Sequence, residues 1–295
     1  MTEKSKMPTY GGQAVIEGVM MRGSRAVAIA MRAPNKEIVV HTEPLGGIYQ
    51  SRLAKIPFLR GLIMLWDALG LGMRFLTLSA NTQSGEDEKL EGPAMYLTLF
   101  ISLAFGIGLF FLAPAAVGQL SESFLKWNSW LGNLVEGIVR LLLLIGYIWL
   151  IGQWGDIRRV FSYHGAEHKT INAFEAGVDL TPENVSKFSV EHPRCGTAFL
   201  LTLVVMSVLL FSLLGPLPAF WRFASRILFL PILAGLAYEF IRWTANHLEN
   251  PLVRLLIKPN LSLQHLTTRE PSLDMLEVAI TAFKTMRTEE ERLVT

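Results

Sequence analysis

The segment YHGAEHKTI (163–171) carries two histidines, His164 and His168, with Glu167 between them. On a helix, residues three and four positions apart are surface neighbours, so both imidazoles can reach one ion while Glu167 lies beside it. This HxxEH pattern is the inverted form of the zinc-peptidase motif, in which the metal activates water and a carboxylate takes its proton. The segment therefore predicts a divalent metal site, with zinc preferred and Glu167 as the catalytic base.

A second cluster, EHPRCGTAF (191–199), offers further ligands. His192 and Cys195 lie three residues apart, and Cys195 is the single cysteine of the chain. Four protein ligands would close the site and make the zinc structural, whereas three would leave a position for water and permit catalysis. A simpler interpretation also stays open, in which the histidines only form hydrogen bonds at a membrane interface. Glu175 shares the helical face of the histidine pair and is a candidate for orienting an imidazole.

Composition places these residues in a membrane protein. Hydrophobic residues make up 51% of the 295 residues and charged residues 18%, below the roughly 25% charged residues of soluble domains. Two uncharged stretches, 94–117 and 196–221, are each longer than the roughly 20 residues that cross a bilayer. Two weaker stretches, 134–152 and 227–242, bring the expected number of transmembrane helices to about four.

Charged residues decide how one more apolar segment is interpreted. Residues 56–80 carry Arg60, Asp67 and Arg74 at seven-residue intervals, which draws a narrow polar stripe on an apolar helix. With four spans and both termini inside, 23 Lys and Arg residues lie on the cytoplasmic side and 3 outside, in agreement with the positive-inside rule. Letting 56–80 cross as well removes this bias. The segment is therefore expected to be an interfacial or re-entrant helix.

Polar segments with regular patterns flank the apolar ones. AVAIAMR (26–32) and EIVVHTE (37–43) lie on either side of a turn and predict a β-hairpin. The preceding GGQAVIEGVMMRG (11–23), with four glycines around Glu17, fits a loop and strand and permits close backbone approach. Residues 272–292 predict an amphipathic helix, with acidic residues early and basic residues late.

The expected fold is an α-helical polytopic membrane protein with a small cytoplasmic α+β part. Its segments are a β-rich part (1–55), an interfacial or re-entrant helix (56–80), a linker (81–92), two transmembrane helices (93–152), a cytoplasmic loop with both histidine clusters (153–195), two more transmembrane helices (196–242) and a carboxyl-terminal helical region (243–295).

Location and partners follow from the same features. The amino terminus has no secretory signal and the single cysteine fits a reducing compartment. We expect a multi-pass protein of the inner (plasma) membrane with both termini in the cytoplasm. The net charge of +2 gives no reason to expect nucleic acid as a partner. The partner that the sequence predicts is the lipid bilayer, and the oligomeric state stays open.

Four motifs together resemble the YqhQ-like family of bacterial membrane proteins, a domain of unknown function. They are GGQAVIEGVMMRG, YHGAEHKTI, HPRCGTAF and QHLTTREP (264–271). The resemblance covers nearly the whole chain and implies a metal-dependent enzyme without identifying a substrate. The chain departs from the inverted zinc peptidases because it lacks their large soluble architecture, which puts proteolysis in doubt.

The favoured function is a membrane-embedded, metal-dependent enzyme of the hydrolase type, with metal-activated water at the cytoplasmic membrane face. In this hypothesis His164 and His168 bind the ion, His192 or Cys195 completes the set, and Glu167 activates the water. The substrate could be a lipid, a peptide or a small molecule.

Two other classes of function compete with this hypothesis. The first is a non-enzymatic membrane scaffold or regulator in which a structural zinc only orders the loop. The second, less favoured, is a transporter, motivated by Glu136, Arg140 and Glu239 within the spans. Four helices without an internal repeat argue against transport, and Glu136 and Arg140 have the spacing of a helical ion pair.

Overall fold

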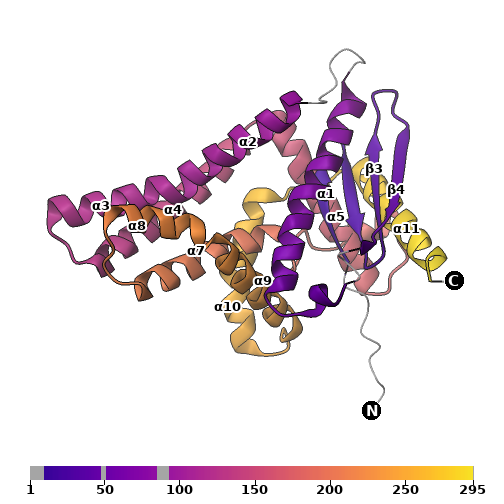
Figure 1. Cartoon of the computed structure of the whole chain (residues 1–295). Helices are drawn as coiled ribbons and strands as arrows, with labels where there is room; N and C mark the ends of the chain where they lie inside the picture. The colour runs from indigo at the N-terminus through magenta and orange to yellow at the C-terminus, as the bar shows by residue number, and fades with distance from the viewer. Residues whose placement is uncertain (1–9, 48–50, 85–92, 295) are drawn as a thin grey trace.

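The computed structural model describes residues 10–47, 51–84 and 93–294. An antiparallel sheet and its covering helices form one end of the molecule, and long apolar helices extend away from it (Figure 1). Most of the predicted linker, from residue 85 to residue 92, lies outside the described residues.

The strands are β1 (Gly11–Val15), β2 (Gly18–Arg22), β3 (Ala26–Arg32) and β4 (Ile38–Pro44). The helices are α1 (Leu59–Gln83), α2 (Pro93–Ile107), α3 (Ala113–Leu125), α4 (Ser129–Ile151), α5 (Gly155–Glu175), α6 (Pro182–Val185), α7 (Gly196–Leu213), α8 (Ala219–Leu228), α9 (Leu230–Asn246), α10 (Pro251–Thr267) and α11 (Leu273–Arg292). A short 3-10 helix, η2 (Arg52–Lys55), precedes α1, and a π-helical turn, η4 (Gly108–Leu112), joins α2 to α3.

The sheet is an antiparallel meander in the order β1-β2-β3-β4. The predicted hairpin is present as β3 and β4, with Ala26 paired to Pro44 and Arg32 to Ile38. The glycine-rich segment before it adds the two further strands β1 and β2. The structure therefore has a four-stranded sheet where the sequence predicted a hairpin preceded by a loop and one strand.

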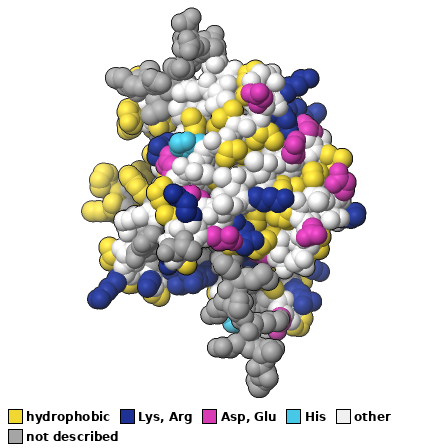
Figure 2. All heavy atoms as spheres, turned by 90° about the vertical axis from the view of Figure 1, so that its right-hand side faces the viewer, with side chains coloured by type: hydrophobic (Ala, Val, Ile, Leu, Met, Phe, Trp, Pro, Cys, Tyr) yellow, Lys and Arg dark blue, Asp and Glu magenta, His cyan; other side chains and the backbone are white. Residues whose placement is uncertain are grey.

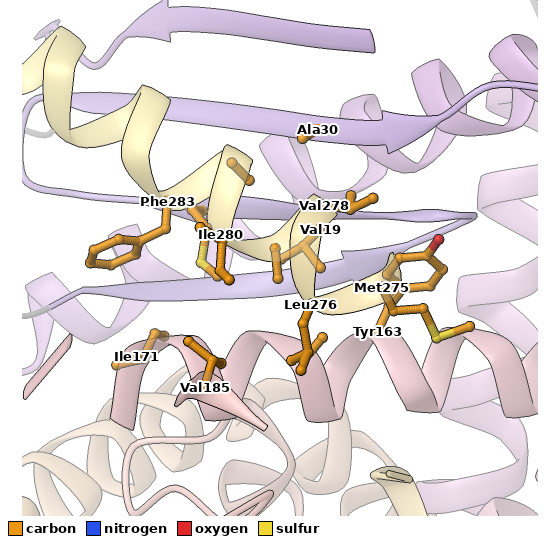
Figure 3. Packing of buried hydrophobic residues seen from close by; sticks show 14 of the residues in the cluster. Val19, Ala30, Tyr163, Ile171, Val185, Met275, Leu276, Val278, Ile280 and Phe283 are labelled. Atoms are coloured by element: carbon orange, nitrogen blue, oxygen red, sulfur yellow. The ribbon is translucent and has the colours of Figure 1, made fainter. Parts of the chain in front are cut away.

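Both faces of the central strands are covered. Alternate residues point to opposite faces of a strand, so Val19 and Ala30 pack against α5 and α11, while Met20 and Ile29 pack against α1. Burial on both sides explains why AVAIAMR shows no alternation of apolar and polar residues. Figure 3 shows the first of these two cores, in which α5 and α11 lie on one face of the sheet.

Helix α5 occupies about half of the predicted cytoplasmic loop, with 21 residues of the range 153–195. It ends at Glu175, and Gly177 follows with a positive φ of 71°, a left-handed conformation that favours glycine after a helix. Helix α11 matches the predicted amphipathic helix of residues 272–292. Helices α5 and α11 share a hydrophobic core with one face of the sheet.

Four helices are long and apolar enough to cross a membrane: Leu59–Gln83, Tyr96–Leu125, Ser129–Ile151 and Gly196–Leu213. The last three correspond to predicted spans. Helices α8 and α9 form a further candidate span that is bent by 46°, and α9 occupies the predicted fourth span. The predicted span 196–221 is shorter than expected, because α7 ends before a turn with Gly215 at a φ of 67°.

Surface composition differs between the two ends of the molecule. Many large apolar side chains are exposed along the candidate spans, for example Phe100, Leu142 and Leu209. The face that carries the sheet and α11 instead shows Lys, Arg, Asp and Glu scattered among uncharged atoms (Figure 2). The first surface suits lipid and the second suits water.

Helix α1 has the features of a candidate span and also covers part of the sheet. It passes the length and composition test for a span, yet its carboxyl-terminal half covers the sheet through buried Phe75, and Ser79 accepts a hydrogen bond from the Ile16 backbone. Buried Asp67, part of the predicted polar stripe, pairs with Arg22 of β2. An interfacial position for α1 stays a prediction.

Candidate metal centre

The HxxEH segment lies in the middle of α5, which places its two histidines on one helix face. The imidazole rings of His164 and His168 have centroids 4.4 Å apart. Cys195 approaches the same position from the start of α7, with its Sγ 3.3 Å from His164 Nε2. One ligand atom from each of these three residues lies within 4.8 Å of the others.

Backbone carbonyls fix the orientation of both imidazoles. His164 Nδ1 lies 2.9 Å from the carbonyl oxygen of Thr267, and His168 Nδ1 lies 2.5 Å from that of Val190. A carbonyl oxygen only accepts hydrogen bonds, so each Nδ1 is the donor, and Nε2 is the nitrogen of each ring that is left to bind a metal. Metal-binding histidines in proteins commonly have this arrangement, with the second ring nitrogen held by a carbonyl or carboxylate.

Cys195 is the N-cap residue of α7, and its sulfur accepts a hydrogen bond from the Thr197 backbone at 3.4 Å. The Thr197 hydroxyl lies 3.1 Å from the same sulfur. The amino-terminal end of a helix favours negative charge, and the thiolate is the form of cysteine that binds metal. The first turn of α7 therefore positions a suitable third ligand.

The distance between two of the three ligand atoms matches the spacing of ligands around zinc. Tetrahedral zinc with bonds of about 2.1 Å to nitrogen and 2.3 Å to sulfur separates two of its ligand atoms by roughly 3.5 Å. The His164 and Cys195 ligand atoms are already at this spacing. The donor set of two neutral imidazoles and a thiol is also one that zinc prefers.

His192 does not join the group of mutually close ligand atoms. Its ring centroid lies 5.7 Å from that of His168, and its Nε2 lies 3.8 Å from Glu175 Oε2. The side chain is buried, and its Nε2 has no hydrogen-bond partner. Burial lowers the pKa of His192, which favours the neutral ring. The structure thus brings together three of the four predicted ligands, and His192 lies beside them.

Glu167 is buried one helical turn from His164, on the side of α5 that faces β1. Burial raises the pKa of its carboxyl to about 7, against the opposing influences of His164 and of a hydrogen bond from the Gly12 backbone. A Cβ atom at Gly12 would lie 3.0 Å from the Glu167 carboxyl carbon and 2.5 Å from the Met20 carbonyl oxygen. The close approach that the glycine-rich segment permits is therefore made to Glu167.

Comparison with known proteins shows which family the chain belongs to. The family described as "Protein of unknown function (DUF1385)" matches residues 56–289. The chain belongs to this family. A relative in Bacillus subtilis (strain 168), "Uncharacterized protein YqhQ", is 34% identical over 298 residues, covering 96% of this chain and 93% of the relative. No solved structure matches the chain.

The residues matched by DUF1385 contain the whole three-ligand group and also the QHLTTREP segment, for which the sequence predicted no role. Gln264 is fully buried, and its amide accepts a hydrogen bond from His192 N and donates one to His192 O. Three residues later, Thr267 supplies the carbonyl that orients His164. The end of α10 therefore holds both the turn before Cys195 and one of the predicted ligands.

A glycine of α5 allows the QHLTTREP segment (264–271) to pass close to this helix. A Cβ atom at Gly165 would lie 2.1 Å from the Arg269 carbonyl oxygen, and the Arg269 backbone donates a hydrogen bond to the Phe161 carbonyl oxygen. The first residue of HGAEH after His164 is thus required to be small. Sequence patterns alone gave no signal for this contact, because the partner atom belongs to the backbone.

The other acidic and histidine candidates are not part of the three-ligand group. Glu175 forms an ion pair with Arg194. Glu239 pairs with Arg60 at the start of α1 and accepts a hydrogen bond from the Phe58 backbone. His247 Nδ1 contacts the Trp243 carbonyl oxygen. Glu239 and His247 therefore have local partners outside the three-ligand group.

Proposed function

We propose that this protein is a membrane-anchored, metal-dependent enzyme of the hydrolase type, whose site lies at the cytoplasmic face of the bilayer. His164, His168 and Cys195 hold one divalent ion, and zinc is the ion that this donor set favours. The bond that is hydrolysed belongs to a lipid head group, a peptide or a small metabolite.

One observation carries the proposal of metal binding: both histidines of the group have Nδ1 held by a backbone carbonyl. This fixes their unprotonated nitrogens for an ion, and it needs two separate chain segments to approach α5. Histidines that only form interfacial hydrogen bonds do not need a buried thiol 3.3 Å away. The convergence supports a metal site over the simpler interpretation.

The number of ligands supports catalysis over a purely structural ion. A structural zinc has four protein ligands, whereas a catalytic zinc has three and an open position. A bound zinc ion would supply Lewis acidity and lower the pKa of a water molecule toward about 7. Glu167, adjacent in sequence to His168 and buried beside His164, is the proposed proton acceptor. His192 is a neutral side chain beside His168.

Metal content of the purified protein tests the first half of the proposal. We expect about one zinc per chain in the wild type and loss of most of it in His164→Ala, His168→Ala and Cys195→Ala. His247→Ala is the matched control, because this histidine is exposed, lies outside the three-ligand group and contacts the carbonyl and the ring of Trp243. Full zinc content in His164→Ala would contradict the proposed site.

Hydrolysis tests the second half. The zinc-loaded protein in lipid nanodiscs is assayed with nitrophenyl esters of phosphate, phosphodiester and carboxylate type and with a quenched peptide library. We expect Glu167→Gln to keep its zinc and to lower turnover by about 10²–10⁴-fold, the usual contribution of a general base. Equal turnover in the two proteins would exclude Glu167 as proton acceptor. Zinc retention without any turnover in the wild type would favour the scaffold with a structural zinc.

A further inference from the structure

A second cluster of charged residues lies among the apolar helices, on elements other than those of the candidate metal centre. Three arginines, Arg140, Arg222 and Arg226, are each at most 3% exposed. Two acidic residues accompany them, Glu136 at 1% exposure and Glu122, whose side chain is 16% exposed. We refer to these five residues as the arginine network.

Glu136 is the centre of the network. Its carboxylate accepts hydrogen bonds from Arg140 Nη2 at 2.7 Å and from Arg226 Nη2 at 2.6 Å, and Arg222 Nη2 lies 3.6 Å away. Glu122 accepts a hydrogen bond from Arg222 Nη1 at 2.7 Å. Helices α3, α4 and α8 are therefore connected by charged groups.

Neutral groups complete the surroundings of the arginines. Asn133 Oδ1 accepts hydrogen bonds from both Arg222 and Arg226. Arg140 donates to the Phe110 carbonyl oxygen at 2.9 Å, an acceptor in the π-helical turn η4, where the regular helical hydrogen bonds are interrupted. These acceptors share the charge of the arginines, but none of them neutralises it.

The network has one positive charge in excess. Three arginines face two carboxylates, and among the described residues no other acidic side chain pairs with them. An arginine does not lose its proton in proteins. A net charge held between apolar helices is unfavourable unless an opposite charge accompanies it. A counter-anion is the remaining way to balance the network.

One donor of the network also lacks a partner. Arg222 Nε is buried and has no hydrogen-bond acceptor. Arg222 lies in the first turn of α8 and Glu122 in the last turn of α3, so this end of the network is close to the helix ends. In the predicted topology these ends lie at the outer membrane surface, where phosphate groups of lipids are found.

We propose that the arginine network is an anion site that takes a phosphate group at its Arg222 end, between α3 and α8. The free Nε of Arg222 can donate a hydrogen bond to a phosphate oxygen, and such a bond between two charged groups is stronger than one between neutral groups. The phosphate comes from the head group of an anionic phospholipid or from inorganic phosphate, and both would supply the missing negative charge. A zwitterionic head group would not, because its phosphate is already balanced by its own cation. This site is independent of the proposed hydrolase activity.

Two variants remove the charge excess in opposite ways. Arg222→Gln leaves two arginines with two carboxylates. Gln119→Glu keeps all three arginines and adds a carboxylate, because Gln119 Oε1 lies 3.4 Å from Arg222 Nη1. Arg60→Gln is the control, since it breaks a one-to-one ion pair with Glu239 outside the network.

Thermal unfolding of the full-length protein measures the requirement for an anion. The probes are inorganic phosphate against chloride at equal ionic strength in neutral detergent, and nanodiscs of phosphatidylglycerol against phosphatidylcholine. We expect phosphate or phosphatidylglycerol to raise the Tm of the wild type and of Arg60→Gln by about 3–8 °C. We expect no such shift in Arg222→Gln or in Gln119→Glu.

The two arms identify the source of the phosphate. A shift only in phosphatidylglycerol nanodiscs assigns the site to a lipid head group, and a shift with inorganic phosphate in detergent assigns it to the free anion. The proposal is overturned if neither probe shifts the wild type. It is equally overturned if Arg222→Gln and Gln119→Glu shift as much as the wild type does.

Discussion

The candidate metal centre depends on backbone groups of distant segments as well as on its own side chains. One ligand atom from each of His164, His168 and Cys195 lies within 4.8 Å of the others. The carbonyls of Thr267 and Val190 orient the two imidazoles, and a backbone carbonyl leaves no signal in residue identity. His192 shows the same limit, because the turn that separates it from the group depends on hydrogen bonds to a distant helix.

Gly12 gives a prediction at the residue scale. Gly12→Ala places a methyl group 2.5 Å from the Met20 carbonyl oxygen and 3.0 Å from the Glu167 side chain, so β1 or Glu167 must shift. We expect the free energy of unfolding to fall by about 1–3 kcal/mol and hydrolysis to fall with it, because Glu167 loses its position. Thermal unfolding and turnover measure the two effects.

Gly11→Ala is the control for this prediction, because nothing lies within 4 Å of the added Cβ. We expect Gly11→Ala to behave like the wild type. Equal stability and turnover in Gly11→Ala and Gly12→Ala would show that β1 does not hold Glu167 in place.

At the scale of elements, regular patterns predicted the helices and strands that have one apolar face or a long apolar run. Helix α11 and the β3–β4 hairpin are present as predicted. Helix α10 lies in the predicted carboxyl-terminal helical region (243–295) but was not predicted as a separate helix, because Pro259 and several polar residues interrupt its pattern. Arg222 and Arg226, between two predicted spans, are instead buried on α8, where Glu136 and Asn133 accept their hydrogen bonds.

Helix α10 contributes a prediction of its own through Gln264. Its amide holds the backbone of His192 through two hydrogen bonds of 2.9 Å. Gln264→Ala removes both and frees the turn that positions Cys195. We expect the zinc dissociation constant to rise by about 10–100-fold, the usual effect of losing a group that supports metal ligands. Competition with a chromogenic chelator measures this constant.

Gln83→Ala is a matched control, because Gln83 also donates its amide to a backbone carbonyl, that of Arg32 in the sheet. We expect this variant to keep the zinc affinity of the wild type. If Gln264→Ala binds zinc as tightly as Gln83→Ala does, α10 has no part in holding the metal ligands.

At the scale of the whole molecule, apolar composition and charge distribution predicted a membrane protein, and the structure contains four helices able to span one. The sequence did not predict which apolar helix also packs against the sheet. Helix α1 has the composition of a span, but Phe75 packs against the sheet and Arg60 binds Glu239 of α9. Such contacts join residues far apart in the chain, and no local pattern reports them.

The packing of the whole molecule predicts which segments lie on the same side of the membrane. The sheet packs on the carboxyl-terminal half of α1, on α5 and on α11, so these parts must share one side of the membrane. We expect single cysteines at Asn35→Cys in the β3–β4 turn and Ser272→Cys before α11 to react with a membrane-impermeant maleimide only after the cells are permeabilised. Ser123→Cys, at the exposed end of α3, should react in intact cells.

The unmodified chain is the control for background labelling, because its Cys195 is buried. Labelling of Ser272→Cys but not Ser123→Cys in intact cells would invert the topology and place the candidate metal centre outside. Labelling of Asn35→Cys and Ser272→Cys from opposite sides would contradict the packing of the sheet against α11, because residues in one buried core cannot be separated by a bilayer. Protection of both is the outcome that the packing requires for a site facing the cytoplasm.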